Sequence, residues 1–78
     1  MHNKMSDEEW EIFSEAYQYM ADHNNPPARQ SAEAEAWWMA AAADAAAIDR
    51  RRQGHPLMRR LLLAIYQYLA EKTKTENH

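Results

Sequence analysis

The glycine and the prolines of this 78-residue sequence lie in only two places and divide it into three segments. One break is Pro26-Pro27 and the other is Gly54-His55-Pro56. Consecutive prolines exclude a continuous helix, and a glycine followed closely by proline is typical of a helix end. Strand-forming residues are scarce, since valine is absent and threonine is rare. The sequence therefore predicts an all-α fold, a compact three-helix up-down-up bundle that forms one helical domain over residues 1–78.

A first helix is predicted over about residues 7–22. Ser6-Asp7-Glu8-Glu9 has the capping-box pattern, in which the serine and glutamate side chains bind backbone N–H groups of the first turn. Large apolar residues then recur at helical spacing on one face, at Trp10, Phe13, Tyr17 and Met20. Ile12 and Tyr19 lie outside this row.

A second helix is predicted over about residues 32–53, with Ser31 as its N-cap and Gly54 as its left-handed stop. Alanine dominates this segment and has the highest intrinsic helix propensity. The apolar stripe of this helix comprises Ala34, Trp37, Trp38, Ala41, Ala45 and Ile48. Because small side chains let neighbouring helices approach closely, we expect this long Ala-rich helix to be the central one.

A third helix is predicted over about residues 56–72, because Pro56 suits the first helical position. Its expected core face comprises Met58, Leu61, Leu62, Ile65 and Leu69. Residues 73–78 are polar, and we expect this tail to fray.

Charge is distributed unevenly along the chain. Residues 1–49 carry ten acidic and two basic residues, whereas residues 50–78 carry two acidic and seven basic residues. In an up-down-up bundle, the acidic start of the first helix and the arginines of residues 50–60 share one end. Two interpretations are open. These charges balance one another within the bundle, or the arginines and His55 bind an anion at the start of the third helix.

The sequence carries no pattern typical of an enzyme or a cofactor site. Cysteine is absent, and the four histidines are far apart. No Gly-rich phosphate loop or metal-binding motif is present, so we expect no catalytic residues, no metal and no cofactor. The longest apolar run, residues 36–43, is too short to span a membrane, and the first residues lack a signal-peptide pattern. We therefore expect a cytoplasmic protein that does not bind membranes.

Protein binding has better support. The adjacent Trp37, Trp38 and Met39 point around about 200° of the second helix, which is too wide an arc for one small core. Leu63 and Tyr66 form another row beside the core face of the third helix. Either the second helix is buried on all sides, or this surface meets a second copy or another protein.

The predicted contact surface combines these apolar residues with arginines at the rim. It comprises Trp37, Trp38, Leu63, Tyr66, Arg51, Arg59 and Arg60. Small cores without disulfides or metals have limited stability, which also favours self-association as a homodimer. A wider acidic face could meet a basic protein partner, and it comprises Glu8, Glu11, Glu15, Glu33 and Glu35.

A dimeric DNA-binding repressor is the alternative. The second helix, the turn and the third helix can be aligned with a helix-turn-helix, with Met58, Arg59 and Arg60 entering the major groove. The net charge of −3 disfavours this interpretation, as do the leucines at 61–63 where polar residues would read the bases.

Four segments resemble small uncharacterised accessory proteins of bacterial prophages and integrative mobile elements. They are MSDEEW (5–10), YMADHNNPP (19–27), GHPL (54–57) and IYQYL (65–69). The resemblance covers most of the chain and implies no site residue. It implies a setting in which proteins of this size are repressors, or inhibitors of host nucleic-acid-handling or defence proteins, such as anti-CRISPR proteins. Our interpretation is a non-enzymatic protein-binding module that acts as such an inhibitor.

Overall fold

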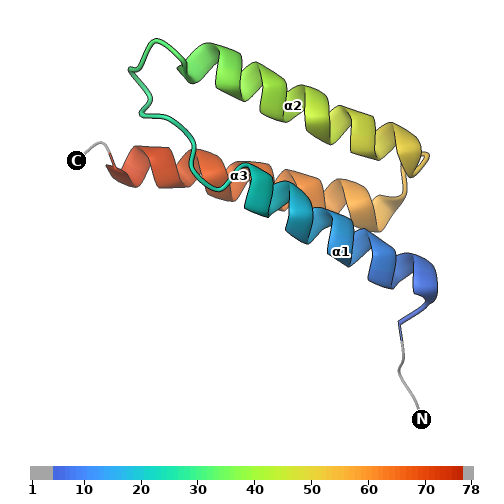
Figure 1. Ribbon diagram of the computed structural model, residues 1–78. Coiled ribbons are helices and arrows are strands. Elements are labelled where there is room, and N and C mark those ends of the chain that lie inside the picture. The colour runs from blue at the N-terminus through green and yellow to red at the C-terminus, as the bar shows by residue number, and fades with distance from the viewer. Residues whose placement is uncertain (1–4, 77–78) are drawn as a thin grey trace.

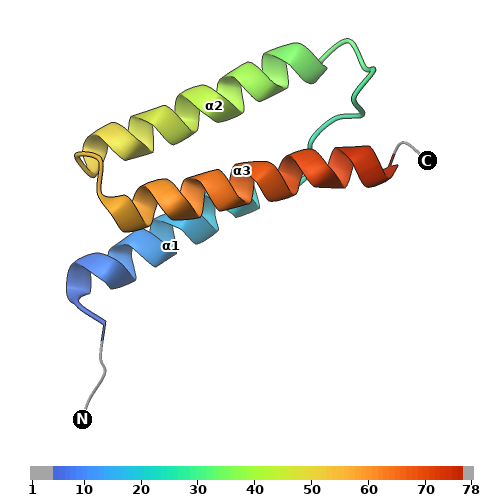
Figure 2. The ribbon, with the colours of Figure 1, turned by 180° about the vertical axis from the view of Figure 1, so that it is seen from behind.

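The computed structural model describes residues 5–76, which form three helices (Figure 1). They are α1 (Asp7–Asp22), α2 (Ala34–Arg51) and α3 (Pro56–Glu76), and no strand occurs between residues 5 and 76. Seen from either side, α1 and α3 run in one direction and α2 runs in the opposite direction (Figure 1, Figure 2). The predicted all-α, up-down-up three-helix bundle is therefore confirmed.

The capping box sets the start of α1. The backbone N–H of Glu9 donates to Ser6 Oγ at 3.1 Å, and the backbone N–H of Ser6 donates to Glu9 Oε1 at 3.0 Å. These two bonds satisfy donors that the first turn of a helix leaves free. The bounds of α1 agree with the predicted helix over residues 7–22.

The start of α2 differs from the prediction. Before the helix, the N–H of Ser31 donates to the carbonyl of Ala28 at 2.9 Å, and the N–H of Ala34 donates to the carbonyl of Ser31 at 3.3 Å. Glu33 occupies the N-cap position without a side-chain hydrogen bond, and the buried Ser31 Oγ has no partner within the described residues. The assignment of Ser31 as the N-cap is wrong, because residues up to Glu33 form a separate turn and the helix begins only at Ala34.

The α2–α3 connection is a tight turn with two left-handed residues. α2 ends at Arg51, before the predicted residue 53, and φ is 56° at Gln53 and 72° at Gly54. The N–H of Gly54 donates to the carbonyl of Asp49 at 3.0 Å, which closes the end of the helix. The positive φ favours glycine at position 54, and a Cβ there would lie 3.1 Å from Arg59 Nη2, so the Arg59 side chain would have to shift.

α3 continues to Glu76, beyond its predicted end at residue 72. Thr73 is only 3% exposed, and its hydroxyl donates to the carbonyl of Ala70 at 2.7 Å. A threonine hydroxyl bonded back to its own helix is satisfied without water, which lets this polar residue lie inside. The predicted polar tail is therefore helical over residues 73–76, and its last residues, 77–78, lie outside the described residues.

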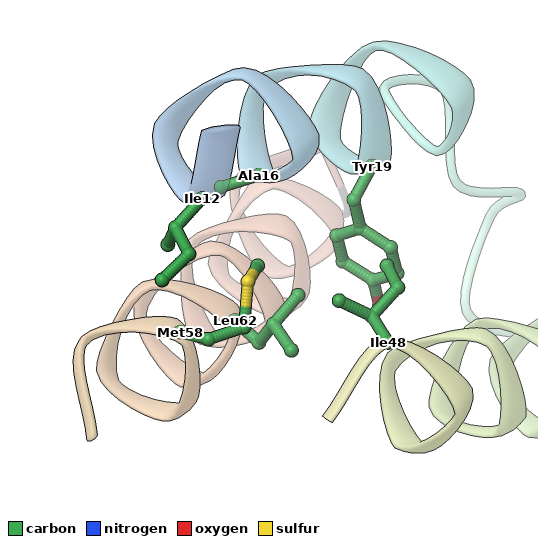
Figure 3. Close-up of a cluster of buried hydrophobic side chains, with 6 residues drawn as sticks. All are labelled: Ile12, Ala16, Tyr19, Ile48, Met58 and Leu62. Carbon is green, nitrogen blue, oxygen red and sulfur yellow. The ribbon is translucent and has the colours of Figure 1, made fainter. Parts of the chain in front are cut away.

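The core joins all three helices (Figure 3). Its buried cluster consists of Ile12, Ala16, Tyr19, Ile48, Met58 and Leu62. The predicted core face of α3 is confirmed, since Met58, Leu62 and Leu69 are buried and Leu61 and Ile65 are partly buried against the cluster. The stripe of α2 also faces inward, with Ala34, Ala41 and Ile48 buried.

The inward face of α1 is the row that contains Ile12, Ala16 and Tyr19. The large apolar row points outward, with exposed fractions of 63% for Trp10, 42% for Phe13 and 73% for Tyr17. Ala16 on the inner row is small enough to let α1 lie close to α3, and the Tyr19 hydroxyl donates to the carbonyl of Ala41 in α2 at 2.9 Å. The periodic aromatic row of α1 is therefore a surface and not part of the core.

α3 is the helix that packs against both others, most closely against α1, although α2 is the middle helix in the sequence (Figure 1). The body measures 49 × 25 × 17 Å. Its radius of gyration of 14.3 Å exceeds the value of about 11.5 Å for an approximately spherical domain of this length. An elongated bundle buries less of its apolar surface, which explains why large apolar residues remain outside.

Candidate functional site

The residues of the predicted contact surface come from α2 and α3 and do not gather in one place. Trp37, Trp38 and Tyr66 come together near the start of α2, where the two indole centroids are 4.7 Å apart and the Trp38–Tyr66 centroids are 5.1 Å apart. The three rings are half-buried and pack edge to face between α2 and α3. Arg51 lies at the other end of α2, about 20 Å further along the helix axis. Arg51 is therefore not at the rim of the aromatic cluster.

Ion pairs connect the end of α2 to α1. Arg51 Nη2 and Arg52 Nε donate to the two carboxylate oxygens of Glu15, the second at 2.9 Å, and Arg52 Nη1 donates to Glu11 at 3.4 Å. Burial opposes the ionisation of Glu15, but the hydrogen bonds and charges of the two arginines outweigh it and lower the pKa of Glu15. These contacts agree with charge balance within the bundle, and they occupy two residues of the predicted acidic face.

The other predicted arginines lie on α3. Arg59 Nε donates to Asp49 Oδ1 at 2.9 Å, and this hydrogen bond raises the pKa of Arg59. Arg60 and Leu63 are exposed, with an exposed fraction of 58% for Leu63. The structure thus brings Trp37, Trp38 and Tyr66 together and does not gather Arg51 and Arg59 around them.

The outer face of α1 was not among the predicted site residues. We define it by the exposed residues Trp10, Phe13, Ser14, Tyr17 and Ala21, the half-buried Met20 beside them, and the exposed Asn24 just beyond the end of the helix. Since an aromatic side chain has about 150–250 Å² of surface, the exposed fractions of its three aromatic residues amount to about 350 Å². Exposed apolar patches of about this size on monomeric proteins are often functional.

Two hollows of about 430 and 200 Å³ lie on the outer face of α1. The first is lined by Trp10, Phe13, Ser14 and Tyr17, with Gln18 at its side. The second is lined by Tyr17, Met20, Ala21 and Asn24. Each set of four residues has the positions i, i+3, i+4 and i+7, the spacing that receives one side chain of a facing helix in coiled-coil packing, and Asn24 of the second set lies just beyond the end of α1 at Asp22. The small side chains of Ser14 and Ala21 leave room for such an insertion.

A third hollow, of about 270 Å³, lies between α1 and α2, and its lining includes charged residues of both helices together with Ala47 and Ile48. In it, His23 Nε2 lies 3.0 Å from Asp44 Oδ2, and His23 Nδ1 lies 2.7 Å from the carbonyl oxygen of Tyr19. The Tyr19 hydroxyl donates to Ala41, and burial, then the charges of Tyr66 and Asp44, raise its pKa. Tyr19 and the His23–Asp44 pair therefore act as links between α1 and α2, and this tyrosine is unsuited to nucleophilic chemistry.

Within residues 5–76, no three His, Asp or Glu side chains are placed to hold one metal ion. In the same part of the chain, no helix combines the length and apolar character needed to cross a bilayer. No protein-family model, curated protein or solved structure matches this chain.

Proposed function

We propose that this chain is a non-enzymatic protein-binding module, which binds another polypeptide by helix pairing on the outer face of α1. The observation that carries the proposal is the pair of hollows between its exposed aromatic residues. Ser14 and Ala21 are seven residues apart, so the hollows are separated by about 10.5 Å along the helix. A facing amphipathic helix would insert apolar side chains one heptad apart into both of them.

The charge of α1 favours a partner with basic residues beside its apolar row. α1 contains six acidic residues and no lysine or arginine, and only two of the six, Glu11 and Glu15, pair with arginines of α2 and its end. The negative charge of α1 would therefore attract a partner with basic side chains. It would repel proteins whose facing surface is acidic. The resemblance to accessory proteins of mobile elements adds a class of target, host proteins that handle nucleic acids or act in defence, which the module would inhibit.

The arginine contacts favour a protein partner over duplex DNA. Arg51, Arg52 and Arg59 each donate to a carboxylate of their own chain. A DNA-binding surface would have to break these pairs before the guanidinium groups could contact phosphates. The alternative function is a dimeric DNA-binding repressor, and the experiment has to distinguish it from a protein-binding module.

The test places a photo-crosslinking amino acid at Ser14, in the first hollow, of the full chain in a bacterial lysate. The matched control carries the same group at Ala43, an exposed residue of α2. Protein adducts that form from position 14 and not from position 43 are the expected result, and mass spectrometry identifies the partner.

Equal adducts from both positions would contradict the proposal, as would the absence of protein adducts from position 14. Retention of duplex DNA that weakens steeply between about 50 and 200 mM salt would instead support the repressor.

A further inference from the structure

We infer that a second copy of this chain covers the outer face of α1, with the two α1 helices antiparallel about a twofold axis. The inference rests on the proposed function, because it names a helix that fills the hollows described above. A twofold interface requires a surface that is complementary to itself, and the outer face of α1 has this property.

The side chains and the hollows of this face match in number and spacing. Trp10 and Tyr17 project from it seven residues apart, and the two hollows repeat at the same spacing. In an antiparallel pair, Tyr17 of each copy enters the first hollow of the other, and Trp10 of each copy enters the second hollow. One register therefore fills all four hollows of the pair, with alternating insertions as in coiled-coil packing.

Charge favours the antiparallel over the parallel arrangement, even though this register places Asp22 of each copy level with Glu8 and Glu9 of the other. Asp7, Glu8 and Glu9 lie in the first turn of α1. A parallel pair would bring these carboxylates of both copies together and would also align the two helix dipoles. The antiparallel pair separates the two acidic ends by about 20 Å along the axis, more than twice the Debye length of about 8 Å at physiological salt.

The area of the face indicates a reversible dimer. Two copies of the aromatic row contribute about 700 Å² of exposed surface, which is below the 1,200–2,000 Å² or so of a stable interface. Such a dimer exchanges with its monomer, so a basic partner helix that binds more tightly can displace the second copy.

Sedimentation equilibrium of the full chain, from about 10 μM to 1 mM, tests the inference in the range of a weak interface. Ala21→Glu puts a charge into the second hollow, and Ala43→Glu makes the same change at an exposed alanine of α2. We expect the wild type and Ala43→Glu to rise from 9.1 kDa toward twice that mass, while Ala21→Glu stays at 9.1 kDa. Ser14→Glu in the first hollow should repeat the loss, and circular dichroism checks that each variant keeps its helices.

The orientation is tested with a spin label at Asp22→Cys, since the chain has no other cysteine. The antiparallel register places the two labels about 20 Å apart along the axis, whereas a parallel pair places them within about 10 Å. A wild type that is monomeric over the whole range, equal effects of the two alanine variants, or the short label distance would each overturn the inference. A strict monomer that still forms protein adducts from position 14 would overturn the dimer and leave the proposed function intact.

Discussion

Tyr19→Phe should weaken the attachment of α2 to α1 by a predictable amount. The Tyr19 hydroxyl is buried and donates to the carbonyl of Ala41 at 2.9 Å. Ala41 lies inside α2, so its carbonyl keeps its own helix partner when the hydroxyl is removed. The loss is therefore that of one neutral hydrogen bond, about 0.5–1.5 kcal/mol in the free energy of unfolding. In a domain of this size, each kcal/mol lowers the thermal midpoint by about 4–8 °C.

Urea and thermal denaturation followed by circular dichroism measure this change. Tyr68→Phe is the matched control, because Tyr68 is half exposed and its contact with Lys72 is made through the ring.

The raised pKa of Tyr19 adds a second signature. Because the folded protein holds the Tyr19 hydroxyl proton more tightly than the unfolded chain does, the contribution of this hydroxyl to stability is fully present below the ordinary pKa of 10. This contribution is lost as pH rises through the folded-state pKa. The stability gap between wild type and Tyr19→Phe should therefore narrow above about pH 10. Equal midpoints for the two phenylalanine variants, or a gap that widens in alkali, would refute this reasoning.

Three further substitutions test other contacts. Glu15→Gln should cost about 1 kcal/mol near neutral pH, after allowance for solvent screening. Because the folded-state pKa of Glu15 is lowered, the stabilisation is present above its ordinary value of 4.5 and is lost as pH falls through the folded value. A difference in urea midpoint that persists at about pH 2 would argue against the ion pairs as its cause. Gln53→Gly should raise the free energy of unfolding by up to about 1 kcal/mol, because a φ of 56° is costly for a residue that has a Cβ. A lower thermal midpoint of this variant than of the wild type would contradict the prediction. Ala16→Leu should cost about 1–3 kcal/mol by overpacking the buried α1–α3 contact, whereas Ala43→Leu on the surface should change little. Equal effects of the two leucines in urea denaturation would exclude close packing at Ala16.

The helices could be predicted because their signals are local. The capping box at Ser6 and Glu9, the stop at Gly54 and the start at Pro56 each act within a few residues. Ser31 is not the cap because the turn before α2 extends two residues further, to Glu33, and a sequence pattern does not reveal how a double-proline loop returns to the bundle.

The inward face of α1 could not be predicted in the same way. Two rows have helical spacing, one large and aromatic and the other containing Ile12, Ala16 and Tyr19. The choice depends on how closely α1 approaches α3 and on whether Tyr19 can reach Ala41, which are contacts between segments far apart in the sequence. Because the aromatic row was described only as one apolar face of the helix, its hollows were not recognised as a candidate site.

The contacts within the aromatic cluster could not be predicted from the sequence either. Trp37 and Trp38 were predicted to meet a partner because they point in different directions on one helix. The antiparallel register of α2 and α3 brings Tyr66 beside Trp38, so the rings contact one another in a single chain. The relative displacement of two helices along their axes is set by the loop and the whole interface, and periodicity within one helix does not determine it.

The three indoles of this chain occupy two different environments. Trp10 is mostly exposed on α1, whereas Trp37 and Trp38 lie edge to face beside Tyr66. Acrylamide should therefore quench the fluorescence of Trp10 first, and covering that indole should shift its emission to the blue. The neighbouring pair should give a coupled near-ultraviolet dichroic band that vanishes on unfolding. One unlabelled sample can thus distinguish association from loss of structure by optical signals alone.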